Sequence, residues 1–264
     1  MDTHVPATAA AQSAVPARAA RADTATAARA VTAVKVYGQG ETAVRALDGV
    51  TLDLAAGFFT AIMGPSGSGK STLLHCLAAL DNLTSGQVFL GGTELGGLDD
   101  KRLTLLRRER IGFIFQSFNL LPALTATDNI TLPLRIRGQA PDQAWIDHLV
   151  RIVGLGGRLR HTPAELSGGE QQRVAAVRAL ASRPEIIYAD EPTGNLDRRT
   201  SDDLLAFLRR AVTELGQTVV MVTHDPVAAA FADRVAFLAD GRVAGDLAEP
   251  TRGRVLDAIK DLEA

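Results

Sequence analysis

The chain has a single cysteine, few aromatic residues and almost no net charge. With only Cys76 among 264 residues, an intrachain disulfide is excluded and a reducing compartment is favoured. The formal net charge of −2 provides no global attraction to nucleic acid or to an anionic membrane, so no nucleic-acid partner is expected. No run of about 18 apolar residues occurs, and we therefore expect no membrane-spanning segment.

The chain does have enough apolar residues for a large folded domain. Hydrophobic residues make up 46% of it, and its length fits one large domain or one domain with an insertion. Residues 1–30 differ, because they are rich in Ala, Thr and Arg and lack both an apolar period and an aromatic residue. We expect a disordered tail there, although a transit peptide shares part of this composition.

Strands and helices are predicted to alternate along most of the remaining chain, which is typical of an α/β core with a parallel sheet. The segment GFFTAIM (57–63) is predicted to be a strand, and KSTLLHCLAAL (70–80) has the length and spacing of a helix. No strong strand is predicted between about residues 117 and 165, so this stretch is interpreted as a helical insertion. A hairpin is expected around 240–241, and a helical tail at 247–264.

A glycine-rich loop carries the clearest chemical motif. GPSGSGKST matches G-x-x-x-x-G-K-[ST], follows a predicted strand and opens a predicted helix, which is the context of a phosphate-binding loop. Its glycines let successive backbone N–H groups turn towards phosphates. Lys70 would bind the β- and γ-phosphates, and the Ser71 hydroxyl would bind Mg²⁺. The residues expected to contact the nucleotide are Gly64, Pro65, Ser66, Gly67, Ser68, Gly69, Lys70, Ser71 and Thr72.

Polar residues follow three other predicted strands, at the edge where parallel sheets bind ligands. Asp190 and Glu191 end the apolar run EIIYADEP; Asp190 would bind Mg²⁺, and Glu191 would orient and polarise an attacking water. Gln116 ends IGFIFQ and could reach both the metal and the water, while His224 ends TVVMVTH and could donate to the γ-phosphate. The alternatives are a solvated turn for the acids and ordinary surface positions for the other two.

The stretch LSGGEQQR predicts a second helix start suited to phosphate. Ser167 and Glu170 have the spacing of a capping box, and Gly168 and Gly169 leave the first turn bare of side chains. A positively polarised helix start of this kind attracts anions. One nucleotide in one chain does not obviously need both this helix start and the loop at 64–72, which favours two chains related by a two-fold axis.

Six motifs occur in the order and spacing of the nucleotide-binding domain of ABC transporters, which residues 31–246 resemble. They are the phosphate loop at 64–72, Gln116, LSGGEQ at 166–171, IIYADE at 186–191, GNLD at 194–197 and His224. The resemblance implies a P-loop NTPase (RecA-like) core with an antiparallel β subdomain and an inserted helical subdomain. Tyr37 matches the position of the aromatic residue on which such domains stack adenine, the alternative being a tyrosine of the strand core.

The resemblance further implies an ATPase that uses ATP and Mg²⁺ and forms a head-to-tail homodimer. Each ATP would lie between the phosphate loop of one chain and Ser167, Gly168, Gly169 and Glu170 of the other. The segment GFIFQSFNLLPALTATDNITLPL resembles the corresponding sequence of ATPases in the lipoprotein-release and macrolide-export branch. This implies a subunit on the cytoplasmic face of a bacterial membrane that powers a separate permease for export or extraction of lipoprotein, peptide or drug-like molecules.

Three further interpretations concern the membrane partner and the alternative classes of protein. The apolar side chains at Phe118, Leu120, Leu121 and Leu124 are the predicted permease attachment, with core packing as the alternative. A P-loop kinase is disfavoured, because a kinase needs an acceptor pocket and not a second phosphate-binding helix start. An ABC ATPase of a cell-division-type signalling complex without cargo stays open.

Overall fold

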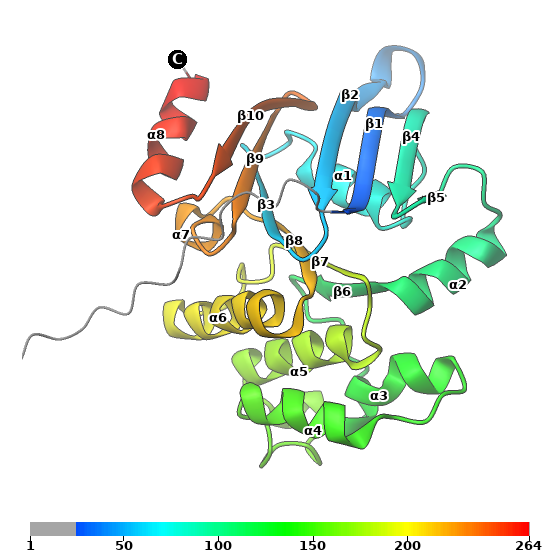
Figure 1. Cartoon of the computed structure of the whole chain (residues 1–264), viewed down its shortest axis with the longest axis vertical. Coiled ribbons are helices and arrows are strands. Elements are labelled where there is room, and N and C mark those ends of the chain that lie inside the picture. Colours follow the sequence, from blue (N-terminus) through cyan, green and yellow to red (C-terminus); the bar gives the residue numbers. More distant parts are fainter. Residues whose placement is uncertain (1–24, 264) are drawn as a thin grey trace, which may run out of the picture.

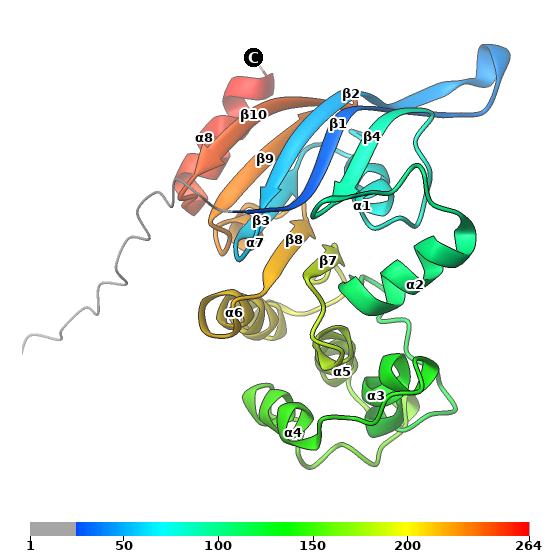
Figure 2. The ribbon, with the colours of Figure 1, turned by 45° about the vertical axis from the view of Figure 1, so that its right-hand side comes forward.

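The computed structural model describes residues 25–263, which form two sheets and a group of helices (Figures 1 and 2). The larger sheet has six strands, which are parallel except for β10. Their order is β10 (Arg242–Ala248), β9 (Arg234–Ala239), β3 (Phe59–Met63), β8 (Thr218–Val222), β7 (Ile186–Asp190), β6 (Ile111–Phe115). Together with the helices on its faces, this sheet confirms the predicted α/β core. Within residues 25–263, no helix is both long and apolar enough to cross a membrane.

The smaller sheet is the antiparallel subdomain that the resemblance implied. Its strand order is β2 (Val44–Ala55), β1 (Thr26–Tyr37), β4 (Ser85–Leu90), β5 (Thr93–Glu94). Helix α1 (Lys70–Leu77) contacts strands of both sheets. A short 3-10 helix, Gly40–Thr42, joins β1 to β2.

The boundary expected at residue 31 is wrong, because β1 begins at Thr26. Ala28 and Ala30 are fully buried, and Arg29 forms a hydrogen bond of 3.1 Å with Asp53 of β2. Alternating alanines carry almost no hydrophobic signal, so composition alone placed these residues in the tail. The rest of that expected tail, residues 1–24, lies outside the described residues.

The core strands are buried on both faces, as parallel strands covered by helices must be. Along β8, Val219 and Met221 belong to one apolar cluster and Val220 and Val222 to the other. The first cluster lies against the helices below the sheet in Figure 1, and the second lies against α1 and the smaller sheet. The carboxyl ends of these strands are therefore held rigidly, which is what a site at that edge requires.

The expected helical insertion is present. Residues 117–165 are all described, contain no strand and hold α3 (Ala126–Ile136), α4 (Gln143–Ile152) and a 3-10 helix (Pro163–Glu165). Both helices pack on α5 (Gly168–Ala181), and the Trp145 indole nitrogen of α4 donates to the Leu180 carbonyl at 3.1 Å. The remaining helices are α2 (Asp100–Arg110), α6 (Arg198–Leu215), α7 (Pro226–Ala229) and α8 (Arg252–Glu263).

The carboxyl-terminal hairpin also agrees with the prediction. Arg242 pairs with Ala239, and the two residues between them, Asp240 and Gly241, both have positive φ, 47° and 72°. This is the two-residue turn that suits the twist of antiparallel strands. The predicted helical tail from 247 begins later, because β10 continues to Ala248.

Candidate functional site

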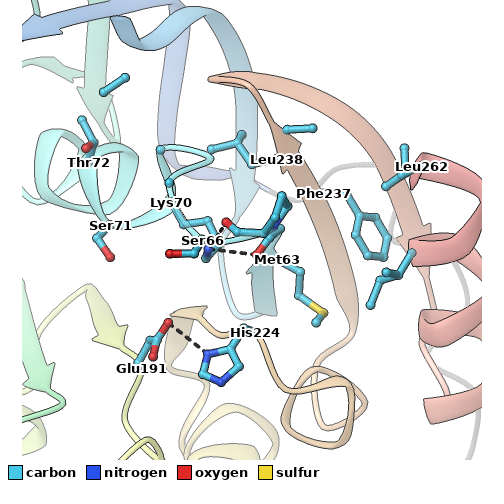
Figure 3. A pocket seen from close by; sticks show the side chains of 17 residues that line it. Met63, Ser66, Lys70, Ser71, Thr72, Glu191, His224, Phe237, Leu238 and Leu262 are labelled. Atoms are coloured by element: carbon cyan, nitrogen blue, oxygen red, sulfur yellow. Dashed lines mark hydrogen bonds and ion pairs between the residues drawn. The ribbon is translucent and has the colours of Figure 1, made fainter. Parts of the chain in front are cut away.

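A cavity of about 730 Å³ opens at the carboxyl ends of β3, β7 and β8 (Figure 3). Its walls come from the glycine-rich loop, from the ends of two core strands and from the carboxyl-terminal part of the chain. The lining residues are Ala46, Met63, Gly64, Pro65, Ser66, Gly67, Gly69, Lys70, Ser71, Thr72, Glu191, His224, Phe237, Leu238, Ala239, Ile259 and Leu262. The loop therefore faces two of the predicted catalytic side chains across one cavity.

The backbone of the loop needs its glycines. Gly69 has a φ of +96°, and a Cβ there would lie 2.2 Å from the Ala46 carbonyl oxygen. At Gly64 a Cβ would lie 2.0 Å from the Leu238 carbonyl oxygen, so the loop is pressed against β9. This cradle fits a phosphate, because backbone N–H groups can approach an anion that a side chain would block.

The Lys70 side chain is hydrogen-bonded to the backbone of the glycine-rich loop. Its ammonium donates to the carbonyls of Gly64 at 2.9 Å and of Pro65 at 2.8 Å, and the residue is 7% exposed. Burial lowers the pKa of Lys70, and the nearby carboxylates of Glu191 and Asp190 oppose part of that shift. The amine is thus placed beside the loop backbone and stabilised as a cation by acids from β7.

Ser71 and Asp190, the two residues predicted to bind Mg²⁺, lie in hydrogen-bond contact. The Ser71 hydroxyl donates to Asp190 Oδ1 at 2.9 Å, bringing a hydroxyl and a carboxylate oxygen together. Oxygen donors of this kind suit Mg²⁺, which usually takes one or two protein ligands with waters and phosphate oxygens. Gln116, expected as a third ligand, does not line the cavity. Its backbone carbonyl accepts from the Asn195 side-chain amide at 3.0 Å.

His75, on the same helix as Ser71, also reaches Asp190. Its Nε2 lies 3.4 Å from Asp190 Oδ2, and this hydrogen bond raises the pKa of His75. One signal was available, because Ser71 and His75 are four residues apart on α1 and so share a helix face. Asp190 is therefore held from two positions on that face.

Glu191 and His224 come together from the ends of β7 and β8. Glu191 Oε1 and His224 Nδ1 are 3.1 Å apart, as the dashed line in Figure 3 marks. Glu191 has a φ of 43°, a conformation that costs a non-glycine residue about 1–3 kcal/mol and is concentrated at functional sites. Its backbone is held at both ends, since its N–H donates to Val222 and its carbonyl accepts from Gly194, both at 3.0 Å.

The turn after Glu191 has a further support that the sequence did not reveal. Gln172 of α5 is fully buried, and its amide donates to the Pro192 carbonyl at 2.6 Å. The turn is therefore tied to α5, and because a glutamine has no charge or special conformation, no sequence signal distinguished Gln172 from its neighbours.

The LSGGE helix start forms the predicted capping box. The Ser167 hydroxyl accepts from the Glu170 N–H at 3.3 Å, and the Glu170 carboxylate accepts from the Ser167 N–H at 2.8 Å. The Ser167 N–H and the Arg158 guanidinium, 2.8 Å away, help to lower the pKa of Glu170. Ser167 and Gly168 are exposed, and none of Ser167, Gly168, Gly169 and Glu170 lines the cavity. The glycine-rich loop and the Ser167 helix start are thus two separate surfaces of the chain, each of a kind that suits a phosphate.

Tyr37 lies outside the cavity lining. Its hydroxyl donates to Asp81 at 2.6 Å, and the ammonium of Lys35 lies 4.8 Å from the ring centroid. Tyr37 is 42% exposed. The pKa of its hydroxyl is raised, mainly by partial burial and to a smaller extent by the hydrogen bond with Asp81. The ring is thus a fixed and accessible face, and adenine stacking on it stays a prediction.

A second cavity, of about 400 Å³, lies between α3, β6 and α5. It is lined by Arg107, Arg108, Ile111, Gly112, Phe113, Phe115, Asn119, Leu132, Pro133, Ile136, Arg178, Ala179 and Ser182. None of the four residues predicted for permease attachment lines it; Leu120 packs against the core, and Leu121 is 46% exposed beside it. The apolar groove thus exists next to the predicted segment but is built from residues of α2, β6, α3 and α5, together with Asn119 and Ser182.

Comparisons with known proteins agree with this geometry. The ABC transporter family model matches residues 47–194. The lipoprotein-releasing system ATP-binding protein LolD of Anaeromyxobacter dehalogenans is 48% identical over 215 residues, covering 80% of this chain and 90% of LolD. The macrolide export ATP-binding/permease protein MacB of Marinobacter nauticus is 45% identical over 212 residues, covering 80% of this chain and 33% of MacB.

Solved structures give the same result for the fold. A dimeric post-hydrolysis state of the ATP-binding cassette MJ0796, bound to ADP and Pi, has a TM-score of 0.77 and 41% sequence identity. That comparison covers 85% of this chain and 99% of the cassette. The sheet order and the glycine-rich loop described above are therefore those of a P-loop NTPase.

Proposed function

The chain belongs to the ABC transporter family, and from this premise we propose that it is the ATP-hydrolysing subunit of a bacterial transporter. It would power a separate membrane permease for export or extraction of lipoprotein, peptide or drug-like molecules, since its relatives include LolD and MacB. The observation that carries the proposal is the cavity in which Lys70, Glu191 and His224 face one another. It would act on the cytoplasmic face of the membrane.

Hydrolysis would depend on positioning and on charge. Glu191 would orient and polarise the attacking water, and His224, 3.1 Å away, would hold that carboxylate and donate to the γ-phosphate. Lys70 would leave the loop carbonyls for the β- and γ-phosphates. The loop residues from Gly64 to Thr72 would cradle the phosphates, and Tyr37 would stack on adenine.

We propose Ser71 and Asp190 as ligands of Mg²⁺, with Gln116 as a further ligand. Their oxygen donors and the 2.9 Å hydrogen bond between Ser71 and Asp190 fit this ion. Mg²⁺ held there would neutralise charge on the β- and γ-phosphates. His75 would keep the Asp190 carboxylate in place through its second oxygen.

The exposed helix start at Ser167 supports a head-to-tail homodimer. Because it does not line the cavity of its own chain, a two-fold axis would bring it over the cavity of the partner. Each ATP would then lie between a phosphate loop and the partner's Ser167, Gly168 and Gly169. Glu170 would act mainly through the capping box that holds this helix start.

The permease would dock in the groove between α3, β6 and α5. The groove is apolar at Phe115, Leu132 and Ile136, and Ile136 is 52% exposed. Three arginines at its edge, Arg107, Arg108 and Arg178, favour a partner helix with an acidic side chain. Leu121, also exposed, lies outside the groove lining and would extend the contact.

The substitution Glu191→Gln tests the proposed chemistry. Glutamine keeps the size of the side chain but cannot act as a base, so ATP turnover should fall at least about 100-fold. ATP affinity should change little, because the phosphate loop and Asp190 are intact. The measurements are steady-state phosphate release and equilibrium binding of a fluorescent ATP analogue.

Glu214→Gln is the matched control, because Glu214 is exposed on α6 and pairs only with Arg210. Its turnover should equal that of the unmodified protein. Near-normal hydrolysis by the Glu191 variant would remove Glu191 from the role of catalytic base.

A further inference from the structure

Helix α8 is fixed to the body of the protein by its first turns. Arg254 donates to the carbonyls of Ala248 at 2.9 Å and Glu249 at 2.7 Å, which ties the helix to the end of β10. Val255 is fully buried in the larger apolar cluster, and Ile259 packs against the same cluster. The helix is thus a rigid part of the domain up to Ile259.

The apolar face of α8 continues beyond the core into the nucleotide cavity. Val255, Ile259 and Leu262 follow one another at spacings of four and three residues and so share one face. Ile259 and Leu262 line the cavity together with Phe237 of β9, and Figure 3 draws Phe237 and Leu262 facing each other at one end of it. A Cβ at Gly245 would lie 3.5 Å from Phe237 and 3.9 Å from Leu262, so both rest on this glycine.

This α8 wall, defined as Phe237, Ile259 and Leu262, has no evident role in binding a triphosphate. It offers no donor or positive charge, and Leu262 is 41% exposed although Phe237 beneath it is 2% exposed. Leu262 therefore extends the apolar face of α8 from the core to the exposed rim of the cavity.

We propose that the α8 wall is covered by a second copy of this chain when ATP closes the dimer. This inference rests on the proposed function, which seats the partner's Ser167 helix start over the cavity. The wall and the phosphate loop line the same cavity, so a chain that closes over the loop also meets its apolar end. The permease groove shares no lining residue with this cavity, which separates the two partners in space.

The experiment compares two exposed leucines of α8 in the Glu191→Gln protein, in which the ATP-bound dimer should persist. Leu262→Glu changes the wall, and Leu256→Glu is the matched control, because Leu256 is 38% exposed but does not line the cavity. Sedimentation velocity over a concentration series gives the dissociation constant of the dimer with ATP. A fluorescent ATP analogue gives the nucleotide affinity of the monomer at concentrations below that constant.

We expect Leu262→Glu to weaken the dimer at least about tenfold and Leu256→Glu by no more than about twofold. Nucleotide affinity of the monomer should be unchanged in both. Equal effects of the two variants on the dimer would overturn the proposal. An equal loss of monomer nucleotide affinity and dimer affinity in Leu262→Glu would also overturn it, because the wall would then contact the nucleotide.

Two further results keep the outcome clear. Leu262→Ser, a smaller change, should weaken the dimer in the same direction, and a normal dimer in a folded Leu262→Ser protein would count against the proposal if Leu262→Glu fails to fold. Absence of ATP-driven dimers in the parent Glu191→Gln protein would instead refute the composite site of the proposed function.

Discussion

At the scale of single residues, Glu191, the proposed general base, is held in a backbone conformation that few residue types adopt. Glu191 has a φ of 43° at the end of β7, and its side chain is 3.1 Å from His224. The strain is held by the hydrogen bonds of the turn and by buried Gln172. A general base on such a turn has little freedom to leave its position, which favours orientation of one water.

The glycines of the phosphate loop allow a test at this scale. Gly67 and Gly69 both have positive φ, 80° and 96°, but a Cβ meets nothing within 4 Å at Gly67 and lies 2.2 Å from the Ala46 carbonyl at Gly69. Gly67→Ala should therefore cost only the conformational penalty of about 1–2 kcal/mol. Gly69→Ala should cost clearly more and abolish ATP binding, as measured by urea unfolding and a fluorescent ATP analogue.

Gly67→Ala serves as the control for Gly69→Ala, because it shares the loop and the sign of φ but not the steric conflict. Equal free energies of unfolding for the two variants would show that the approach of Ala46 does not determine the need for glycine at 69.

At the scale of elements, helix α5 links the two candidate surfaces. Its first turn is the Ser167 helix start, and its last turn contributes Arg178 to the permease groove. The Arg178 guanidinium donates to the carbonyls of Phe118 at 2.8 Å and Asn119 at 2.6 Å. Phe118 and Asn119 both have positive φ, 58° and 48°, so the arginine holds a strained turn directly after Gln116. Helix α5 and the hydrogen bonds of Arg178 therefore link the turn at 118–119 to the Ser167 helix start.

Replacing Arg178 by methionine tests this link. The change keeps the bulk of the side chain but removes two charge-assisted hydrogen bonds, and burial already lowers the pKa of this arginine. We expect a loss of roughly 3 kcal/mol in the free energy of unfolding, measured with urea. Arg210→Met, which breaks an exposed pair with Glu214, should cost no more than about 0.5 kcal/mol.

A loss for Arg178→Met no larger than that for Arg210→Met would mean that the turn at 118–119 is stable without the arginine. Arg178→Lys should lie between the two, because lysine keeps the charge but cannot reach both carbonyls with a planar group.

At the scale of the whole molecule, one chain carries two halves of a nucleotide site that do not meet within it. The cavity holds the phosphate loop, Glu191 and His224, while Ser167 and Gly168 are exposed elsewhere. Two-fold symmetry makes two complete sites from two such chains. In the proposed dimer ATP would join the chains, and hydrolysis followed by release of phosphate would remove the joining charge, so that a chemical step would open the pair.

A mixture of two inactive variants tests the composite site. Lys70→Ala damages the phosphate loop, and Gly168→Asp places a carboxylate where the partner's γ-phosphate would lie. Each homodimer has two damaged sites, whereas the heterodimer combines both defects in one site and leaves the other intact. Heterodimers that depend on ATP should therefore form in the mixture and be captured through different tags on the two chains.

Gly168→Asp alone should bind ATP but should not dimerise. Normal ATP-driven dimerisation of that variant would contradict the composite site, and the second glycine-rich helix start would need another function.

The local chemistry of this protein follows from short stretches of its amino-acid sequence. A glycine pattern, a capping box and acids after an apolar strand each follow from backbone and side-chain requirements within a few residues, so the loop at 64–72, the Ser167 helix start and the Asp190–Glu191 pair were all predictable. The alternation of strands and helices predicted the α/β core, the lack of a strong strand between about 117 and 165 predicted the helical insertion, and the family resemblance implied the antiparallel subdomain.

The contacts between residues of distant segments become visible only in the folded chain. Asp190 with His75, the residues of the permease groove and the wall of Ile259 and Leu262 all depend on how separate elements pack, which no local spacing encodes. The beginning of β1, residues 26–30, was missed for the same reason, because alanines become core residues only when a neighbouring strand covers them. The residue types that a local motif requires can be recognised within a short segment. Contacts between distant segments arise instead from the burial of apolar surface by the whole chain.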